Sequence, residues 1–129
     1  MKYVILMVDD DKTVLDSLLY QLKDHFGFDY QYESALSADE AQEIIDELYQ
    51  DGNAVKLIIT DWLMPETKGD TFLININKTY PDIKLLMLSG YADDESVEQA
   101  RQMVPLGGYL RKPWEEQELI GKVKELLEQ

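Results

Sequence analysis

Polar residues with complementary chemistry follow short apolar runs at intervals along this chain. Each run has the length and composition of a β-strand, and a carboxylate, a hydroxyl or an ammonium group follows four of them within two residues. The residues in these positions are Asp9, Asp10, Asp11, Asp61, Ser89, Lys112 and Pro113. If the strands are parallel, all of these residues meet at one edge of the sheet.

Such a set of side chains suits phosphoryl transfer. Clustered carboxylates repel one another, and their pKa values rise unless a cation neutralises them. Mg²⁺ suits the role because it prefers oxygen ligands and shares its octahedral shell with water and phosphate. One carboxylate can then attack a phosphoryl group and form an aspartyl phosphate. An ammonium and a hydroxyl group stabilise the oxygens that are transferred.

Each of these residues also has a simple structural explanation when it is taken alone. Asp11 is expected to cap the helix that follows it, and Asp9 with Asp10 could equally form a turn. Ser89 stands before a glycine and fits an ordinary loop, while Lys112 fits an exposed surface lysine. The functional interpretation therefore depends on the whole set following strands in order.

The composition predicts one ordinary globular domain that spans residues 1–129. No cysteine is present, so disulfides and thiolate metal sites are excluded, and a cytoplasmic location is expected. Acidic residues number 26 against 12 basic ones, for a net charge of −14. This charge disfavours direct binding to nucleic acid or to an anionic membrane. No apolar run is long enough for a signal peptide core or a membrane span.

Strand-like and helix-like stretches alternate along the chain. The expected strands are residues 3–8, 28–32, 55–60, 83–88 and 108–110. The expected helices are centred on residues 14–22, 38–48, 72–76, 97–104 and 119–127. Runs 55–60 and 83–88 are almost wholly apolar, as strands covered on both faces are, whereas 28–32 alternates like an edge strand. Ser37 with Glu40 predicts a capping box for the second helix.

Strict alternation predicts an α/β fold in which a parallel sheet carries helices on both faces. We expect a doubly wound, flavodoxin-like (βα)5 domain with strand order 2-1-3-4-5. In such a sheet the binding site lies beyond the carboxyl ends of the strands. The polar residues described above are expected there.

The sequence resembles the receiver domains of two-component response regulators, including the chemotaxis regulators. The matching stretches are VILMVDDDKTVL, LIITDWLMPETKGDTFL, IKLLMLSGYAD and GYLRKPW, which together span the chain almost end to end. The resemblance implies a phosphoacceptor rather than a true enzyme. It implies phosphate transfer from the phosphohistidine of a sensor histidine kinase or phosphotransfer protein.

The resemblance also implies a role for each matching residue at the metal site. Asp61 resembles the phosphoacceptor of the family. Asp9 and Asp10 are similar to its acidic pair, which binds Mg²⁺ together with the phosphoacceptor. The backbone carbonyl of Leu63 is implied as a further metal ligand.

Residues from the later strands are implied in phosphate binding and switching. Ser89 and Lys112 resemble the hydroxyl and the lysine that contact the phosphoryl group. Pro113 is implied to follow a cis peptide bond, which is essentially a proline feature. Tyr109 matches an aromatic switch position. The face formed by residues 97–104, 108–110 and 119–127 is implied to bind a downstream effector or a second copy of the chain.

The positions that overhang the phosphoryl group in this family are Leu63 and Tyr91. Neither side chain offers a carboxylate or amide to orient an attacking water, so we expect a comparatively long-lived phosphoryl group. The kinase, the signal, the output and the presence of an effector domain after Gln129 cannot be named from these residues.

Two other classes of protein remain as alternatives. In a haloacid-dehalogenase-like phosphatase, Asp9 would be the nucleophile of an Asp-x-Asp-x-Thr motif completed by Asp11 and Thr13. That assignment leaves Asp61 without a role, and the chain is short for that enzyme core. A flavodoxin-like electron carrier would need a loop after the first strand that binds phosphate, whereas the DDDKT loop repels it.

Overall fold

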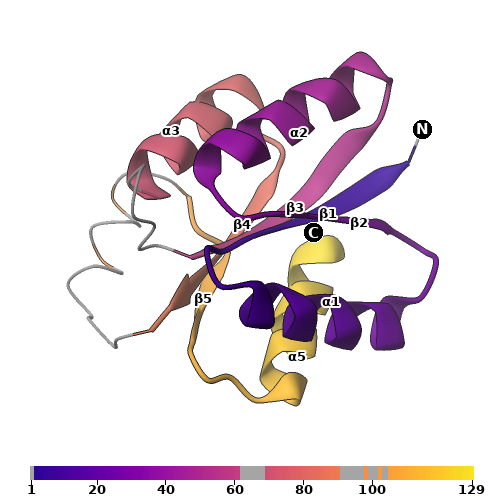
Figure 1. The fold of residues 1–129 in the computed structure, drawn as a ribbon, viewed down its shortest axis with the longest axis vertical. Coiled ribbons are helices and arrows are strands. Elements are labelled where there is room, and N and C mark those ends of the chain that lie inside the picture. The colour runs from indigo at the N-terminus through magenta and orange to yellow at the C-terminus, as the bar shows by residue number, and fades with distance from the viewer. Residues whose placement is uncertain (1, 62–68, 91–97, 99–101, 103–104) are drawn as a thin grey trace.

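Five parallel strands form one sheet with helices on both faces in the computed structural model (Figure 1). The structure describes residues 2–61, 69–90, 98, 102 and 105–129. The strands are β1 (Tyr3–Val8), β2 (Gln31–Ala35), β3 (Ala54–Asp61), β4 (Lys84–Ser89) and β5 (Gly108–Arg111). The helices of the described part are α1 (Lys12–Phe26), α2 (Ala38–Gln50), α3 (Gly69–Thr79) and α5 (Glu116–Leu127).

The strand order is β2-β1-β3-β4-β5, and every neighbouring pair is parallel, which confirms the predicted flavodoxin-like topology. The register aligns the carboxyl ends of the strands. Val8 of β1 lies opposite Ala35 and Thr60, and Asp61 lies opposite Leu88. Residues that follow these strands therefore come together at one edge.

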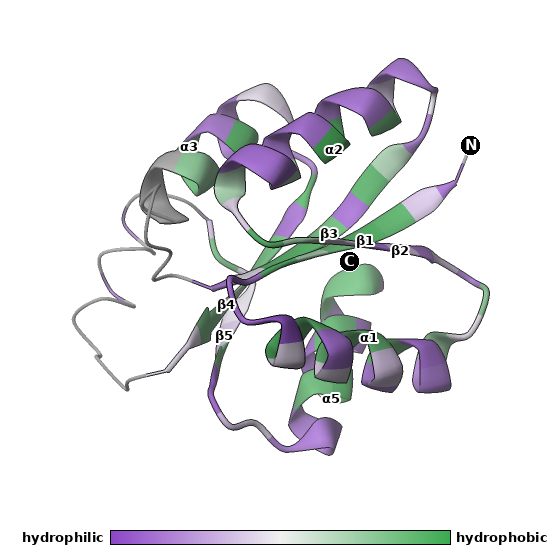
Figure 2. Cartoon of the chain, viewed as in Figure 1, coloured by the Kyte–Doolittle hydropathy of each residue, from purple (hydrophilic) through white to green (hydrophobic). Residues whose placement is uncertain are grey.

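Two apolar layers hold the helices onto the sheet, as Figure 1 shows. Alternate residues of β1 point to opposite faces: Val4 and Leu6 pack in the layer beneath α2 and α3, whereas Ile5 and Met7 pack in the layer beneath α1 and α5. The strands are thus apolar on both faces, and the polar residues lie on the outer surfaces of the helices (Figure 2). This double coverage explains the nearly continuous apolar runs.

The predicted caps of α1 and α2 are confirmed. The carboxylate of Asp11 accepts the backbone N–H of Thr13 at 2.9 Å and caps α1. The hydroxyl of Ser37 accepts the N–H of Glu40 at 3.1 Å, and the Glu40 carboxylate accepts the N–H of Leu36 at 3.3 Å. These reciprocal bonds are the capping box at the start of α2.

The predicted strand at 28–32 is wrong in its bounds, because β2 begins at Gln31. Gly27 has a φ of 59°, and the hydroxyl of Tyr32 donates to its carbonyl at 2.9 Å. These contacts form a turn that leaves Phe28 fully exposed. Pairing of Gln31 with Val4 then sets the start of the edge strand.

The predicted helix at 97–104 lies outside the described residues, except for Glu98 and Gln102, which are helical. None of the described helices has the length and apolar character that crossing a bilayer requires.

Candidate functional site

Two carboxylates lie side by side where β1 and β3 end. Asp9 follows β1, and its N–H continues the ladder to β2 by donating to Ala35 at 3.1 Å. Asp61 is the last residue of β3. Asp9 is fully buried and Asp61 is 6% exposed, whereas the neighbouring Asp10 is exposed. A buried carboxylate is costly unless a positive charge or hydrogen-bond donors lie beside it.

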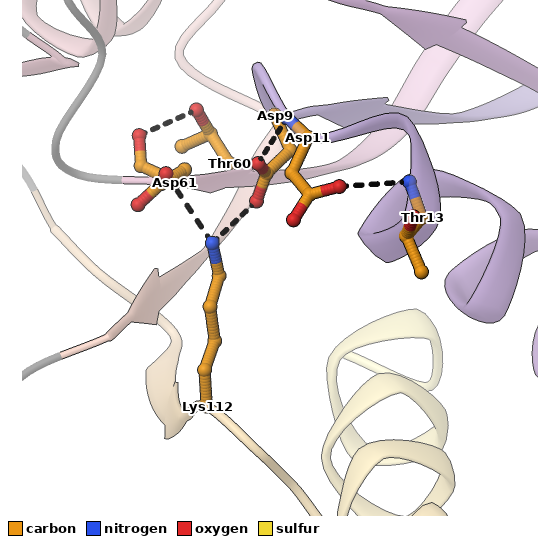
Figure 3. A network of polar contacts seen from close by, with 6 residues as sticks. All are labelled: Asp9, Asp11, Thr13, Thr60, Asp61 and Lys112. Carbon is orange, nitrogen blue, oxygen red and sulfur yellow. Dashed lines mark hydrogen bonds and ion pairs between the residues drawn. The ribbon is translucent and has the colours of Figure 1, made fainter.

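Lys112 supplies that positive charge from the loop that follows β5. Its Nζ donates to Oδ2 of Asp9 at 2.6 Å and lies 3.3 Å from Oδ2 of Asp61 (Figure 3). Burial on its own would lower the pKa of Lys112. The hydrogen bond to Asp9 and the negative charges of Asp61 and Asp9 outweigh burial, so the pKa is raised overall. The ammonium therefore stays charged while it bridges the carboxylates.

The Lys112 backbone is also held in place. Its N–H donates to the carbonyl of Ser89 at 2.7 Å, which ties the start of the β5–α5 loop to the end of β4. The Lys112–Pro113 peptide bond is cis, as predicted.

The Asp9 side chain is fixed through both of its oxygens. Oδ2 accepts from Lys112, and Oδ1 accepts the N–H of Asp11 at 2.9 Å. Because Asp11 also caps α1, the start of that helix is tied to the same carboxylate (Figure 3). The hydroxyl of buried Thr60 donates to the backbone carbonyl of Asp61 at 3.2 Å.

The oxygen ligands needed for a hard cation are present. One carboxylate oxygen from each of Asp9, Asp10 and Asp61 lies within 4.8 Å of the others. Such an all-oxygen set suits Mg²⁺. Leu63, predicted to add a backbone carbonyl, lies outside the described residues, as does Tyr91.

Ser89 lies on β4, the neighbour of β3, and Tyr109 lies on β5, one strand further from Asp61. Ser89 ends β4 and is 8% exposed. Tyr109 of β5 is half-buried and packs with Leu106 against buried Met87. The structure thus brings Asp9, Asp10, Asp61 and Lys112 together and places Ser89 at the same edge of the sheet.

Sequence reasoning missed one contact beside this site. Trp114 packs against the apolar layer beneath α1 and α5. Its indole N–H also donates to Oε1 of Gln21 on α1 at 2.8 Å. The available signal was the polar set Thr13, Ser17 and Gln21, whose spacing of four residues places them on one face of a helix.

Comparison with known proteins agrees with this geometry. The sequence matches the family described as "Response regulator receiver domain" over residues 5–124. The chain is 36% identical over 124 residues to the sensor kinase CckA of Brucella abortus (strain 2308), covering 96% of this chain but only 12% of that protein. It is 27% identical to a chemotaxis protein CheY homolog of Campylobacter jejuni subsp. jejuni serotype O:23/36 (strain 81-176), covering 95% of this chain and 91% of that one.

A solved structure shares the fold over almost its whole length. The signal receiver domain of an HD domain-containing protein from Pseudomonas fluorescens Pf-5 superposes with a TM-score of 0.85 at 27% identity. The match covers 99% of this chain and 96% of that chain. The family match, the strand order and the acidic edge of the sheet agree, and the chain belongs to the response regulator receiver domain family of two-component systems.

Proposed function

We propose that this receiver accepts a phosphoryl group on Asp61 beside a Mg²⁺ ion held by Asp9, Asp10 and Asp61. The observation that carries the proposal is the bridge from Lys112 to both Asp9 and Asp61 among oxygens that lie within 4.8 Å of one another. Receiver domains in general take phosphate from histidine kinases or phosphotransfer proteins. We extend that donor class to this chain, with residues 1–129 as one receiver domain.

The reaction follows from the charges at the site. An Asp61 oxygen attacks phosphorus, the phosphorus–nitrogen bond of the phosphohistidine breaks, and the bond electrons leave with the imidazole. Bound Mg²⁺ supplies positive charge for the phosphoryl oxygens. Lys112 already lies at Asp61 and would contact the new phosphate, and the Ser89 hydroxyl would donate to it. The domain promotes its own modification and does not turn over a separate substrate.

The choice of Asp61 over Asp9 as nucleophile rests on access. Asp9 is fully buried, and both of its oxygens accept hydrogen bonds. Asp61 retains some exposure at the edge of the sheet. Asp11, which completes the Asp-x-Asp-x-Thr motif of the phosphatase alternative, is occupied as the cap of α1. These contacts favour the receiver chemistry.

The proposed output is a change at β5 and α5. Tyr109 packs in the small cluster with Leu106 and Met87, next to the strand that ends in Ser89. We propose that phosphate draws Ser89 toward Asp61 and alters the packing of Tyr109. The surface of β5, α5 and residues 97–104 would then change its affinity for an effector or for a second copy.

The test is labelling with acetyl phosphate and Mg²⁺, followed by intact-mass and peptide mass spectrometry. Wild type and Asp16→Asn, altered at an exposed carboxylate of α1, are expected to gain one phosphoryl group. Asp61→Asn is expected to gain none. Labelling that survives Asp61→Asn, or a phosphopeptide that contains Asp9 instead, would overturn the assignment.

A further inference from the structure

We propose that the hydrogen bond between Gln21 and Trp114 positions Lys112 for phosphoryl transfer. In this role Gln21 and Trp114 act through Lys112 and never touch the phosphoryl group. The inference rests on the proposed function, because it concerns the rate at which Asp61 is phosphorylated.

The loop between β5 and α5 has two polar anchors on either side of Pro113. At one side the N–H of Lys112 donates to the carbonyl of Ser89 at 2.7 Å. At the other side the indole N–H of Trp114 donates to Oε1 of Gln21 at 2.8 Å. The first anchor holds the loop to the sheet, and the second holds it to α1.

These anchors are part of a closed ring of contacts that runs from Lys112 through Asp9 and α1 back to Trp114. Lys112 donates to Oδ2 of Asp9, and the other oxygen of Asp9 accepts the N–H of Asp11. Asp11 caps α1, and α1 carries Gln21, which accepts from Trp114. A change in the spacing between α1 and the loop therefore displaces the Lys112 ammonium relative to Asp9.

The loop lacks a close-packed neighbour on part of its α1 side. A groove of about 370 Å³ lies there, lined by Thr13, Val14, Ser17, Gln21, Lys112, Pro113 and Trp114. Since the groove leaves this side open, packing alone restrains the loop only partly. The hydrogen bond from Trp114 to Gln21 is the directional restraint that spans it.

The ammonium must be well placed because it stabilises charge that develops in the transition state, and small displacements from the productive geometry slow reactions strongly. Loss of one such hydrogen bond corresponds to roughly a three- to tenfold change in rate. That range is the effect expected when Gln21 no longer holds Trp114.

The experiment measures phosphorylation rates with acetyl phosphate at saturating Mg²⁺. Gln21→Leu and Trp114→Phe are each expected to lower the maximal rate roughly three- to tenfold, without a change in the half-saturating donor concentration. Gln21→Glu keeps an acceptor oxygen and is expected to retain the wild-type rate. The matched control is Gln42→Leu, the same replacement on α2, where Gln42 bonds only to Asp46 of its own helix. It is expected to change nothing.

A double-mutant comparison with Lys112 decides whether Gln21 affects the rate by positioning Lys112. Gln21→Leu is expected to slow the wild type but to have no effect in a Lys112→Met background. Equal slowing in both backgrounds, or none in either, overturns the inference. Trp114→Phe keeps an aromatic ring against the apolar layer and removes the N–H donor together with the second ring, so its rate decides the matter if Gln21→Leu lowers the melting temperature. Failure of the proposed function is separate, because it would appear as labelling of Asp61→Asn.

Discussion

Replacing Lys112 by Met removes the positive charge between Asp9 and Asp61 and keeps a side chain of similar reach. In the wild type, Nζ lies 2.6 Å from Asp9 and 3.3 Å from Asp61, and the lysine side chain is 20% exposed. The substitution leaves a fully buried carboxylate without its counter-charge. We expect the metal-free domain to lose stability and to bind Mg²⁺ more tightly.

The size of the loss follows from two physical magnitudes. Opposite unit charges about 4 Å apart attract by about 4 kcal/mol at an effective dielectric constant of about 20. Breaking a buried ion pair from one side costs roughly 3–5 kcal/mol in proteins. Because Lys112 keeps a fifth of its side chain in water, we expect a loss at or just below the lower end of this range, about 2–3 kcal/mol.

Metal binding should partly reverse this loss. In the wild type the cation enters a site whose negative charge Lys112 already offsets in part, whereas in Lys112→Met it meets carboxylates without that offset. We expect roughly tenfold tighter binding of Mg²⁺, or about 1.4 kcal/mol. Lys12→Met is the control, because it removes the same charge from an exposed lysine at the start of α1.

The assay is urea unfolding at pH 7, with and without Mg²⁺, supported by calorimetric titration of the metal. The raised pKa of Lys112 adds a pH signature. Its contribution is fully present below the unfolded-state value of about 10.4 and is lost as pH rises through the higher folded value. The difference between wild type and Lys112→Met should therefore be constant from about pH 7 to 9 and shrink only above about pH 10.4. Equal stability of the two proteins without metal, or equal Mg²⁺ affinity, would refute the idea that Lys112 offsets the charge of Asp9 and Asp61.

Other substitutions test the fold by urea unfolding. A methyl group at Gly107 would overlap the buried Leu126 side chain, so Gly107→Ala should cost about 1–3 kcal/mol; Gly121→Ala, with open space around it in α5, should stabilise by about 0.5–1 kcal/mol. Ser37→Ala removes the cap of α2 and should cost about 1 kcal/mol; no change would argue against the cap. Burial raises the pKa of Tyr49, so its contribution to stability is lost as pH rises above about 10, and Tyr49→Phe should flatten the fall in stability above that pH.

Much of the architecture could be predicted because its signals are local. Apolar runs and helical periodicity give the type and order of the elements, and β1 begins and ends where predicted. The edge strand was misplaced because its pattern is weak there. The turn that displaces it depends on Tyr32 reaching back to Gly27 and on pairing of Gln31 with Val4. Those contacts are not visible in the pattern of residues 28–32.

The order of residues along the chain is enough to predict which of them meet at the carboxyl edge, because parallel strands bring their ends together whatever the details of packing. It does not show how their charges are balanced. Lys112 was expected to contact a phosphoryl group, and the fold places it on Asp9, 103 positions away in the chain. Gln21 and Trp114 are separated by 93 positions, and nothing local links them. Such pairs come from the folded arrangement alone, because they depend on how closely α1 and the β5–α5 loop approach once both are positioned by the apolar layer beneath α1 and α5.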